Sequence, residues 1–478
     1  MKVPCLLFLT AGLIFFVLLV SNIMLIPLEI DSVVYAQGEE NTTTARGREI
    51  PGASFAHNAG NPVVNDPKLK VETVFRGLQL PTTIAFLGPN DILVLEKATG
   101  TVQRITNGKL LAKPLLKVNV ASEVERGMLG IAISKNKNIT NNTYVFLYFT
   151  EKITNNNNIN ATNTIENSTN SNEPLLVANR VYRYEFVNGK LVNPKLLLDL
   201  PAAPGPRHNG GAIIIGPDNN LYTPIGDIDG HTSQAQNQNG MDGAPPDGTG
   251  GILRITQDGK PIGNGIIGNN NPANKYYAYG IRNSFGIDFD PVTKRLWDTE
   301  NGAGANDEIN IVEPGFNSGW IQVQGKTPVD FDFSNLVNFG GKGKYRDPEF
   351  SWFDPVGPTK ILFLNSDKLG KEYKNDIFVS TIHFGRIYHF KLNDNRSGLV
   401  LTGPLADKVA DTDEETKGMT FGSDFGGISD MTIGPDGYLY VVSLGRGTIY
   451  RIVPTTSIAA GSSDVLTTSN EQKKNNIR

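Results

Sequence analysis

Cysteine is almost absent from this chain of 478 residues. The single one, Cys5, lies inside an apolar run at the N-terminus, so disulfides are excluded from the rest of the chain. Charge is also scarce: charged residues make up 19%, and the net charge is −4. There is no basic run of the kind that binds a phosphate backbone, so we expect no nucleic-acid partner.

Long hydrophobic runs are missing everywhere except at the N-terminus. Residues 3–28 carry no charge and could cross a bilayer, and Val34 and Ala36 suit a small-residue cleavage site. Residues 1–36 are therefore predicted to be a secretory signal or an uncleaved anchor. The bulk of the chain is expected to be extracellular or at the cell surface, touching a membrane only through this segment. Six Asn-x-Ser/Thr sequons fit an exported glycoprotein; they begin at Asn41, Asn138, Asn141, Asn160, Asn167 and Asn395.

Glycine and proline are abundant, at 51 and 28 residues, and they punctuate a recurring pattern. A short apolar strand, a Pro/Asp/Gly/Asn turn and an alternating strand with aromatics recur six times, which is the pattern of a β-hairpin. The six copies begin at Thr83, Gly127, Gly211, Gly286, Ile361 and Met431. Repeated hairpins bury their faces by stacking on one another, and closing the ring removes free edges. The predicted fold is an all-β six-bladed propeller; the alternative is a pair of β-sandwich domains.

Polar segments set the expected boundaries. Residues 37–66 form a linker, 67–454 the propeller and 455–478 a flexible tail. The Asn/Thr-rich residues 150–172 are expected to be a surface insertion inside the propeller.

Histidine is rare as well, with five in the chain, and one stands out. His208 precedes a glycine pair and a regular strand, and Asp227 ends the strand that follows, in "RHNGGAIIIGPDNNLYTPIGD". A histidine titrates near neutral pH and can take a hydroxyl proton, and a carboxylate on its other nitrogen fixes its tautomer. The other interpretation is a turn histidine with Asp227 capping the turn. The remaining histidines, His57, His231, His383 and His389, have no such context.

Three segments together resemble the glucose/sorbosone dehydrogenase family, which includes the soluble quinoprotein glucose dehydrogenases and the aldose sugar dehydrogenases. They are the His208–Asp227 segment, "ERGMLGIAI" from Glu125, and "YAYGIRNSFGIDFDPVTKRLWDTENGAGANDEINIVEPGFNSGW" from Tyr277. The resemblance implies a six-bladed propeller that holds pyrroloquinoline quinone and calcium at the channel mouth. It implies oxidation of an aldose at C1 to the lactone, with an external electron acceptor. It also implies that His208 is the general base and that Asp227 orients it.

Further roles follow only from the resemblance. Arg282 and Asn283 match a pair beside the quinone carbonyls; the alternative for Arg282 is an ion pair between blades. The family's calcium is held by backbone carbonyls that match Gly302 and Ala303. Asp307 and Glu308 resemble metal ligands, but they equally suit turn and inter-blade hydrogen bonds.

The chain departs from the family at cofactor-binding positions. His383 stands where the glucose dehydrogenases have a lysine, and Gly427 and Ser429 stand where they have two arginines. Glu125 and Asn301 each replace a glutamine. Pyrroloquinoline quinone carries three carboxylates, and each lost charge-assisted bond weakens its binding by roughly 1.5–3 kcal/mol. Arg386 or Arg446 could substitute from neighbouring loops.

These observations leave three functional hypotheses. The first is an exported quinoprotein dehydrogenase acting on a small sugar. The second is a non-catalytic propeller at the cell surface that binds a glycan or a protein. The third is a calcium-dependent lactonase, which would need a ring of carboxylates in the channel.

Overall fold

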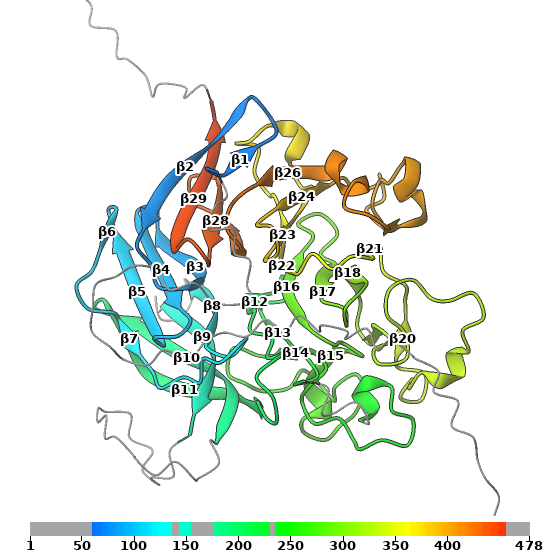
Figure 1. The fold of residues 1–478 in the computed structure, drawn as a ribbon. Helices are drawn as coiled ribbons and strands as arrows, with labels where there is room; N and C mark the ends of the chain where they lie inside the picture. Colours follow the sequence, from blue (N-terminus) through cyan, green and yellow to red (C-terminus); the bar gives the residue numbers. More distant parts are fainter. Residues whose placement is uncertain (1–59, 136–142, 154–175, 230–234, 456–478) are drawn as a thin grey trace, which may run out of the picture.

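The computed structural model describes residues 60–135, 143–153, 176–229 and 235–455. Their strands form six sheets around a common centre, so the predicted all-β propeller is confirmed (Figure 1). The only helices in the described residues are short 3-10 turns, and none of them is long and apolar enough to cross a membrane. They are η1 (Gln236–Gln238), η2 (Ala273–Lys275), η3 (Phe333–Asn335), η4 (Lys371–Tyr373), η5 (Gly403–Asp407) and η6 (Glu415–Met419).

The first two sheets are built from consecutive antiparallel strands. One holds β3 (Pro81–Gly88), β4 (Asp91–Glu96), β5 (Thr101–Thr106), β6 (Lys109–Leu110) and β7 (Leu116–Lys117). The next holds β8 (Met128–Lys135), β9 (Thr143–Lys152), β10 (Val177–Val187) and β11 (Lys190–Pro201). The predicted insertion falls between β9 and β10, where residues 154–175 lie outside the described residues.

The third and fourth sheets carry the segments with the strongest motifs. The third holds β12 (Ile214–Ile215), β13 (Leu221–Ile225), β14 (Gly251–Ile255), β15 (Tyr276–Tyr279), β19 (Phe316–Asn317) and β20 (Lys344–Tyr345). The fourth holds β16 (Ser284–Phe289), β17 (Leu296–Glu300), β18 (Asp307–Val312), β21 (Phe350–Trp352) and β25 (Val409–Ala410).

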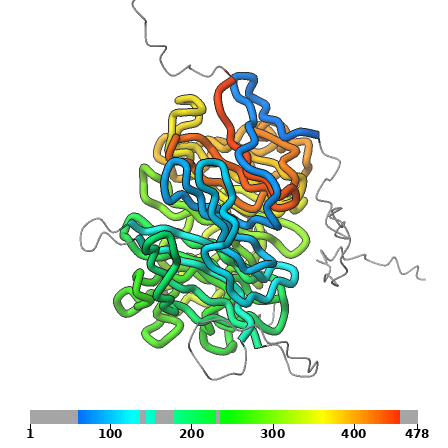
Figure 2. The backbone as a smooth tube through the Cα atoms, turned by 90° about the vertical axis from the view of Figure 1, so that its left-hand side faces the viewer, coloured from blue at the N-terminus to red at the C-terminus, as the bar shows by residue number. Residues whose placement is uncertain are grey.

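The last two sheets each take a strand from the start of the described chain. The fifth holds β22 (Pro358–Phe363), β23 (Ile377–Thr381), β24 (Ile387–Phe390), β26 (Thr420–Ser423) and β1 (Val63–Val64). The sixth holds β27 (Ile428–Ile433), β28 (Leu439–Ser443), β29 (Thr448–Pro454) and β2 (Leu69–Arg76). The pairing of β2 with β29 places the beginning of the described chain beside its last strand and closes the ring (Figures 1 and 2).

The structured region begins before the boundary expected at residue 67. Val63 and Val64 pair with Ser423 and Gly422 through the backbone, and Asp66 accepts a hydrogen bond from the hydroxyl of Tyr373 at 2.8 Å. An edge strand pairs through backbone groups, so the polar composition of the segment concealed it.

The repeat predicted from the sequence recurs in side-chain detail. In the turn after β12, Asp218 accepts a hydrogen bond from the hydroxyl of Tyr222 at 3.0 Å. In the turn after β27, Asp436 accepts one from Tyr440 at 2.9 Å. The two "GPD" turns therefore fix the register of their hairpins in the same way.

The core is divided among the sheet interfaces. Six clusters of buried apolar side chains each lie between two neighbouring sheets, and together they run round the ring without a gap. The innermost strands β3, β8, β12, β16, β22 and β27 line the centre. Loops at their starting ends therefore face one mouth of the channel.

Candidate active site at one mouth of the channel

His208 and Asp227 form a buried pair next to β12 and β13. Nδ1 of His208 lies 2.5 Å from Oδ1 of Asp227, and the two residues are 7% and 1% exposed. His208 has a left-handed backbone, with φ 61°, and its carbonyl accepts from the N–H of Gly226 at 3.1 Å. A Cβ on Gly226 would lie 2.8 Å from Cβ of His208 and 2.3 Å from the carbonyl oxygen of Arg282. Glycine is therefore required there for the pair to meet.

Asp227 is held from its other side by Trp320. The indole Nε1 donates to Oδ2 of Asp227 at 2.8 Å, and the backbone N–H of Asp227 donates to the carbonyl of Arg282 at 2.9 Å. One carboxylate thus binds an imidazole through Oδ1 and an indole through Oδ2. This is the arrangement that fixes the tautomer of a catalytic histidine.

Arg282 lies directly before β16 and faces the same mouth. Its Nη1 donates to the carbonyls of Asn301 at 2.8 Å and Gly302 at 2.7 Å. Its guanidinium carbon lies 5.4 Å from the centre of the Trp320 ring, within range of a cation–π contact. In the described residues the guanidinium therefore bonds backbone carbonyls, and it does not form the ion pair considered as an alternative.

Glu125 lies against His208. Its Oε2 accepts from the backbone N–H of His208, and its Oε1 lies 3.5 Å from the amide nitrogen of Asn283. Burial of the carboxylate raises the pKa of Glu125, and the neighbouring His208 and Arg282 partly counter this effect. Within the described residues the amide oxygen of Asn283 is buried without a hydrogen-bond partner.

Two of the residues expected at the calcium, Gly302 and Asp307, already use their acceptor oxygens within the protein. The carbonyl of Gly302 accepts from Arg282, and Ala303 donates its N–H to Gln324 at 3.1 Å. Asp307 accepts from the N–H groups of Gly302, Val356 and Gly357 at 2.7–2.9 Å. In the described ranges no group of three or more His, Cys, Asp or Glu side chains could hold a metal ion.

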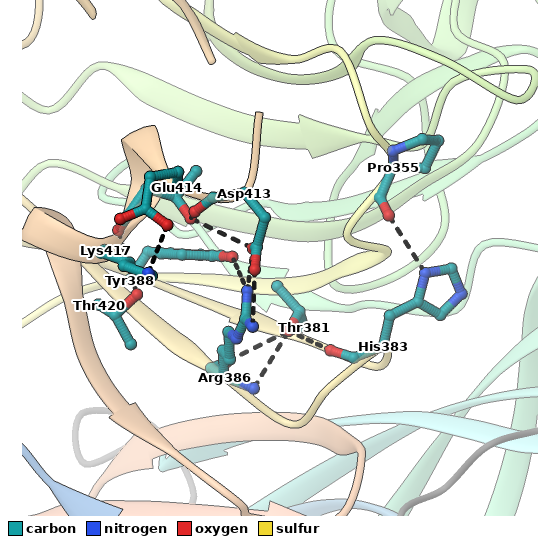
Figure 3. A network of polar contacts seen from close by, with 10 residues as sticks. Pro355, Thr381, His383, Arg386, Tyr388, Asp413, Glu414, Lys417 and Thr420 are labelled. Atoms are coloured by element: carbon teal, nitrogen blue, oxygen red, sulfur yellow. Dashed lines mark hydrogen bonds and ion pairs between the residues drawn. The ribbon is translucent and has the colours of Figure 1, made fainter. Parts of the chain in front are cut away.

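Asn301 joins the site to the neighbouring sheet. Its side chain donates to the carbonyl of Pro358 at 3.0 Å, at the start of β22, and to the carbonyl of Asn283 at 3.3 Å. His383, after β23, is exposed, and its Nδ1 lies 3.4 Å from the carbonyl of Pro355 (Figure 3). A Cβ on Gly357 would lie 3.4 Å from the His383 ring, so His383 stands beside the backbone that binds Asp307.

The two arginines proposed as substitutes for missing cations have other partners. Arg386 forms a two-pronged ion pair with Asp413 (Figure 3). Its guanidinium carbon also lies 4.8 Å from the centre of the Phe384 ring. Arg446 donates to the carbonyl of Gly60 at 2.9 Å. Ser429 donates its hydroxyl to the carbonyl of Pro81 at 2.8 Å, and the backbone of Gly427 is left-handed, with φ 73°.

The other histidines do not join the described site. His389 pairs with Asp376 through Nε2 at 2.8 Å and stacks on Phe378. His57 and His231 lie outside the described residues, as do all the sequons except the one at Asn395, which is exposed in a turn.

Three residues of the site were missed in the sequence. Trp320 and Glu300 both lie in the quoted Tyr277 segment, where a Gly-Trp pair and a Glu before Asn301 were available signals. Lys97 is 5% exposed and donates to the carbonyl of Ser122 at 2.8 Å. Burial lowers the pKa of Lys97 to about 8, although Glu125 and Glu123 oppose the shift.

Comparison with known proteins identifies the family. Residues 78–451 match the model of the glucose/sorbosone dehydrogenase family. The chain belongs to the glucose/sorbosone dehydrogenase family. An uncharacterized protein of Synechocystis is 25% identical over 82% of this chain and 91% of its own length. Quinoprotein glucose dehydrogenase B of Acinetobacter calcoaceticus is 28% identical over 53% of this chain and 52% of its own length.

A solved structure supports the fold of this family member. The aldose sugar dehydrogenase of Streptomyces coelicolor, in its form bound to pyrroloquinoline quinone, superposes with a TM-score of 0.55. The match covers 81% of this chain and 98% of that one, at 24% identity. The family and its curated relatives support an oxidoreductase of the sugar dehydrogenase type.

Proposed function

We propose that this family member oxidises the C1 hydroxyl of an aldose to the lactone, with His208 as the general base. The observation that carries the proposal is the buried contact of 2.5 Å between Nδ1 of His208 and Asp227, which itself bonds Trp320. Because Asp227 accepts a hydrogen bond from Nδ1–H of His208, the lone pair on Nε2 of His208 is left to take the proton of the sugar's C1 hydroxyl. Among the described residues the ring of His208 hydrogen-bonds through Nδ1 alone.

Removal of that proton makes the C1 hydrogen leave as hydride more readily. The imidazolium that forms stays next to the Asp227 carboxylate, which stabilises its charge. Trp320 keeps the carboxylate from rotating away, and Glu125 holds the backbone of the base. The chain thus supplies a base that is held at both its ring and its backbone.

The residues present fit the quinone edge of pyrroloquinoline quinone. Arg282 offers a guanidinium, and Asn283 offers an amide whose oxygen is buried and unpartnered in the described residues. When bound, the quinone supplies the two-electron acceptor for the hydride. Arg282 would stabilise negative charge there. The edge of pyrroloquinoline quinone that carries its carboxylates has fewer partners, since Arg386 forms an ion pair with Asp413.

Calcium is part of the same proposal, with Gly302 and Ala303 as its backbone ligands and Asp307 beside them. In the present arrangement the Gly302 carbonyl accepts from Arg282, so a cation at that oxygen would use its second lone pair and lie close to the guanidinium charge.

The cellular setting and the blade count belong to this proposal too. We infer one blade per sheet, which gives six blades. We also infer export, an external electron acceptor and a small sugar as substrate, supported by the apolar N-terminal run and the sequon at the exposed Asn395.

An isotope experiment tests the reaction. An aldose deuterated at C1 should be oxidised more slowly than the unlabelled sugar, and carbon NMR should show the lactone or its hydrolysed acid as the product. Equal rates with both sugars would mean that C1–H cleavage does not limit the reaction. Oxidation at another carbon would contradict the assigned substrate position.

Lysine in place of His383 should tighten cofactor binding. The substitution restores a cation at an exposed position of the mouth, and one charge-assisted bond of roughly 1.5 kcal/mol corresponds to about tenfold in Kd. Calorimetric titration with pyrroloquinoline quinone measures it, with Val400→Lys as a control at an exposed position outside the network. Equal affinities of the H383K and wild-type proteins would place the cofactor carboxylates elsewhere.

Glu125→Gln should also tighten binding of the anionic cofactor, by about tenfold near neutral pH, because it removes a nearby negative charge. The pKa of Glu125 is raised, so protonation neutralises it as pH falls. Wild-type affinity should therefore rise as pH falls through that pKa, and E125Q should show a flatter dependence. Identical pH profiles of Kd would show that Glu125 does not face the cofactor.

The non-catalytic propeller is the second candidate function. The observation that favours it is the engagement of Arg386 by Asp413, together with Gly427 and Ser429 at positions where the family has arginines. Glycan binding by the wild-type protein without turnover would support this alternative.

A further inference from the structure

Glu300, the last residue of β17, has its carboxylate buried behind Arg282. The residue is 5% exposed. Its Oε1 accepts from the backbone N–H of Arg282 at 2.6 Å, and its Oε2 accepts from the hydroxyl of Ser318 at 2.6 Å. One carboxylate therefore ties together the loop before β16 and the loop after β19, which belong to different sheets.

Those two loops are the ones that hold Asp227. The carbonyl of Arg282 accepts from the N–H of Asp227 at 2.9 Å. Trp320, two residues after Ser318, donates its indole N–H to Oδ2 of Asp227 at 2.8 Å. In the first loop the residue that contacts Asp227, Arg282, also binds Glu300, and in the second loop the two contacts are two residues apart.

The Arg282 side chain is tied to the same strand end. Its Nη1 bonds the carbonyls of Asn301 and Gly302, the two residues that follow Glu300. Glu300 therefore fixes the backbone of Arg282, and the residues after Glu300 fix its guanidinium. A shift of the strand end would move both parts of Arg282 together.

The bond to the Arg282 backbone distinguishes Glu300 from its buried neighbours. Glu308, opposite it on β18, accepts from Gly325 at 2.6 Å and Asn310 at 3.1 Å, and the Ser318 hydroxyl lies 3.5 Å from its Oε2, longer than the 2.6 Å to Glu300. Asp290, beyond the far end of β16, is fully buried and binds Arg396, Thr293 and Val292. Burial of a carboxylate alone therefore does not link a residue to Asp227.

We propose that Glu300 is a positioning residue that holds Arg282 and the Ser318–Trp320 loop in the places from which they fix Asp227, and through it His208. The expected effect on the rate rests on the proposed function. Glu300 itself touches no reacting atom, and its effect reaches His208 only through Asp227.

Glu300→Ala should disturb the base without removing it. A misplacement on the order of 1 Å costs about 100-fold in rate, so kcat should fall by about that factor while KM changes little. The proton between Nδ1 of His208 and Asp227 should give a strongly deshielded NMR signal, assigned by its loss in His208→Ala. In E300A this signal should shift or broaden.

Conservative and matched variants separate positioning from stability. In Glu300→Gln the amide oxygen can accept from Arg282 and the amide N–H can donate to the Ser318 hydroxyl, so kcat and the NMR signal should be retained. Glu300→Asp, one methylene shorter, should behave like E300A and serves if E300A does not fold. Asp290→Ala should lower the melting temperature but leave the signal and kcat in place.

Two outcomes would overturn the inference. One is a folded E300A or E300D protein with an unchanged signal and unchanged kcat. The other is an equal loss in E300A and D290A, which would show a general effect of removing a buried carboxylate. If the wild-type protein has no turnover, the proposed function fails, and the NMR comparison still decides whether Glu300 fixes the pair.

Discussion

His208→Ala is expected to lower kcat for aldose oxidation by about 10²–10⁴-fold, the usual contribution of a general base. Cofactor affinity should stay close to wild type, because His208 bonds Asp227 and Glu125 and the quinone edge is assigned to Arg282 and Asn283. Dye reduction under saturating sugar measures kcat, and calorimetry measures the affinity.

The chain provides a matched control for this variant. His389 also forms a pair with an aspartate, Asp376, at 2.8 Å; this pair is partly buried and lies outside the candidate site. His389→Ala should therefore keep its turnover. Full activity in H208A would refute the assignment of the base, and equal losses in both variants would indicate a structural effect.

Asp227→Asn should lower kcat by about 10³–10⁴-fold, comparable to the loss seen when a triad aspartate is made neutral. The carboxylate accepts from the imidazole at Oδ1 and from the indole at Oδ2. An amide has only one oxygen, so its N–H₂ group must face one of the two donors. If it faces His208, the imidazole must carry its proton on Nε2 and can no longer accept one there.

Adding Trp320→Phe to the Asp227→Asn variant should recover part of the lost rate. Without the indole donor, the amide oxygen can turn to Nδ1 of His208 and its N–H₂ group can take the vacated side. Steady-state kinetics of D227N, W320F and the double variant form a double-mutant cycle. Strictly additive losses would show that the indole and the imidazole do not compete for Asp227.

The hairpin repeats could be predicted because their signals are local. The turns at Asp218 and Asp436 carry both the backbone bend and the tyrosine contact within four residues. The β1 strand was missed, because its pairing with residues 422–423 depends on backbone groups and on a partner more than 350 residues away. No local pattern records such a contact.

The same distinction holds in the site. His208 and Asp227 were found because both lie in one hairpin with a histidine in an unusual context. Trp320 and Glu300 were missed, since each acts through a partner distant in the sequence: Asp227 lies 93 residues from Trp320, and Arg282 lies 18 residues from Glu300. The sequence shows that the family's cationic residues are replaced at His383, Gly427 and Ser429. The ion pair between Arg386 and Asp413 is visible only in the structure.

The most direct test of the account uses the full chain with pyrroloquinoline quinone and calcium. Cofactor binding is followed by calorimetry, and dye reduction is followed with a panel of aldoses, with H208A as the matched control. The account predicts binding at micromolar concentrations, reduction that depends on both cofactor and sugar, and binding without reduction in H208A. Absence of cofactor binding at these concentrations would contradict it.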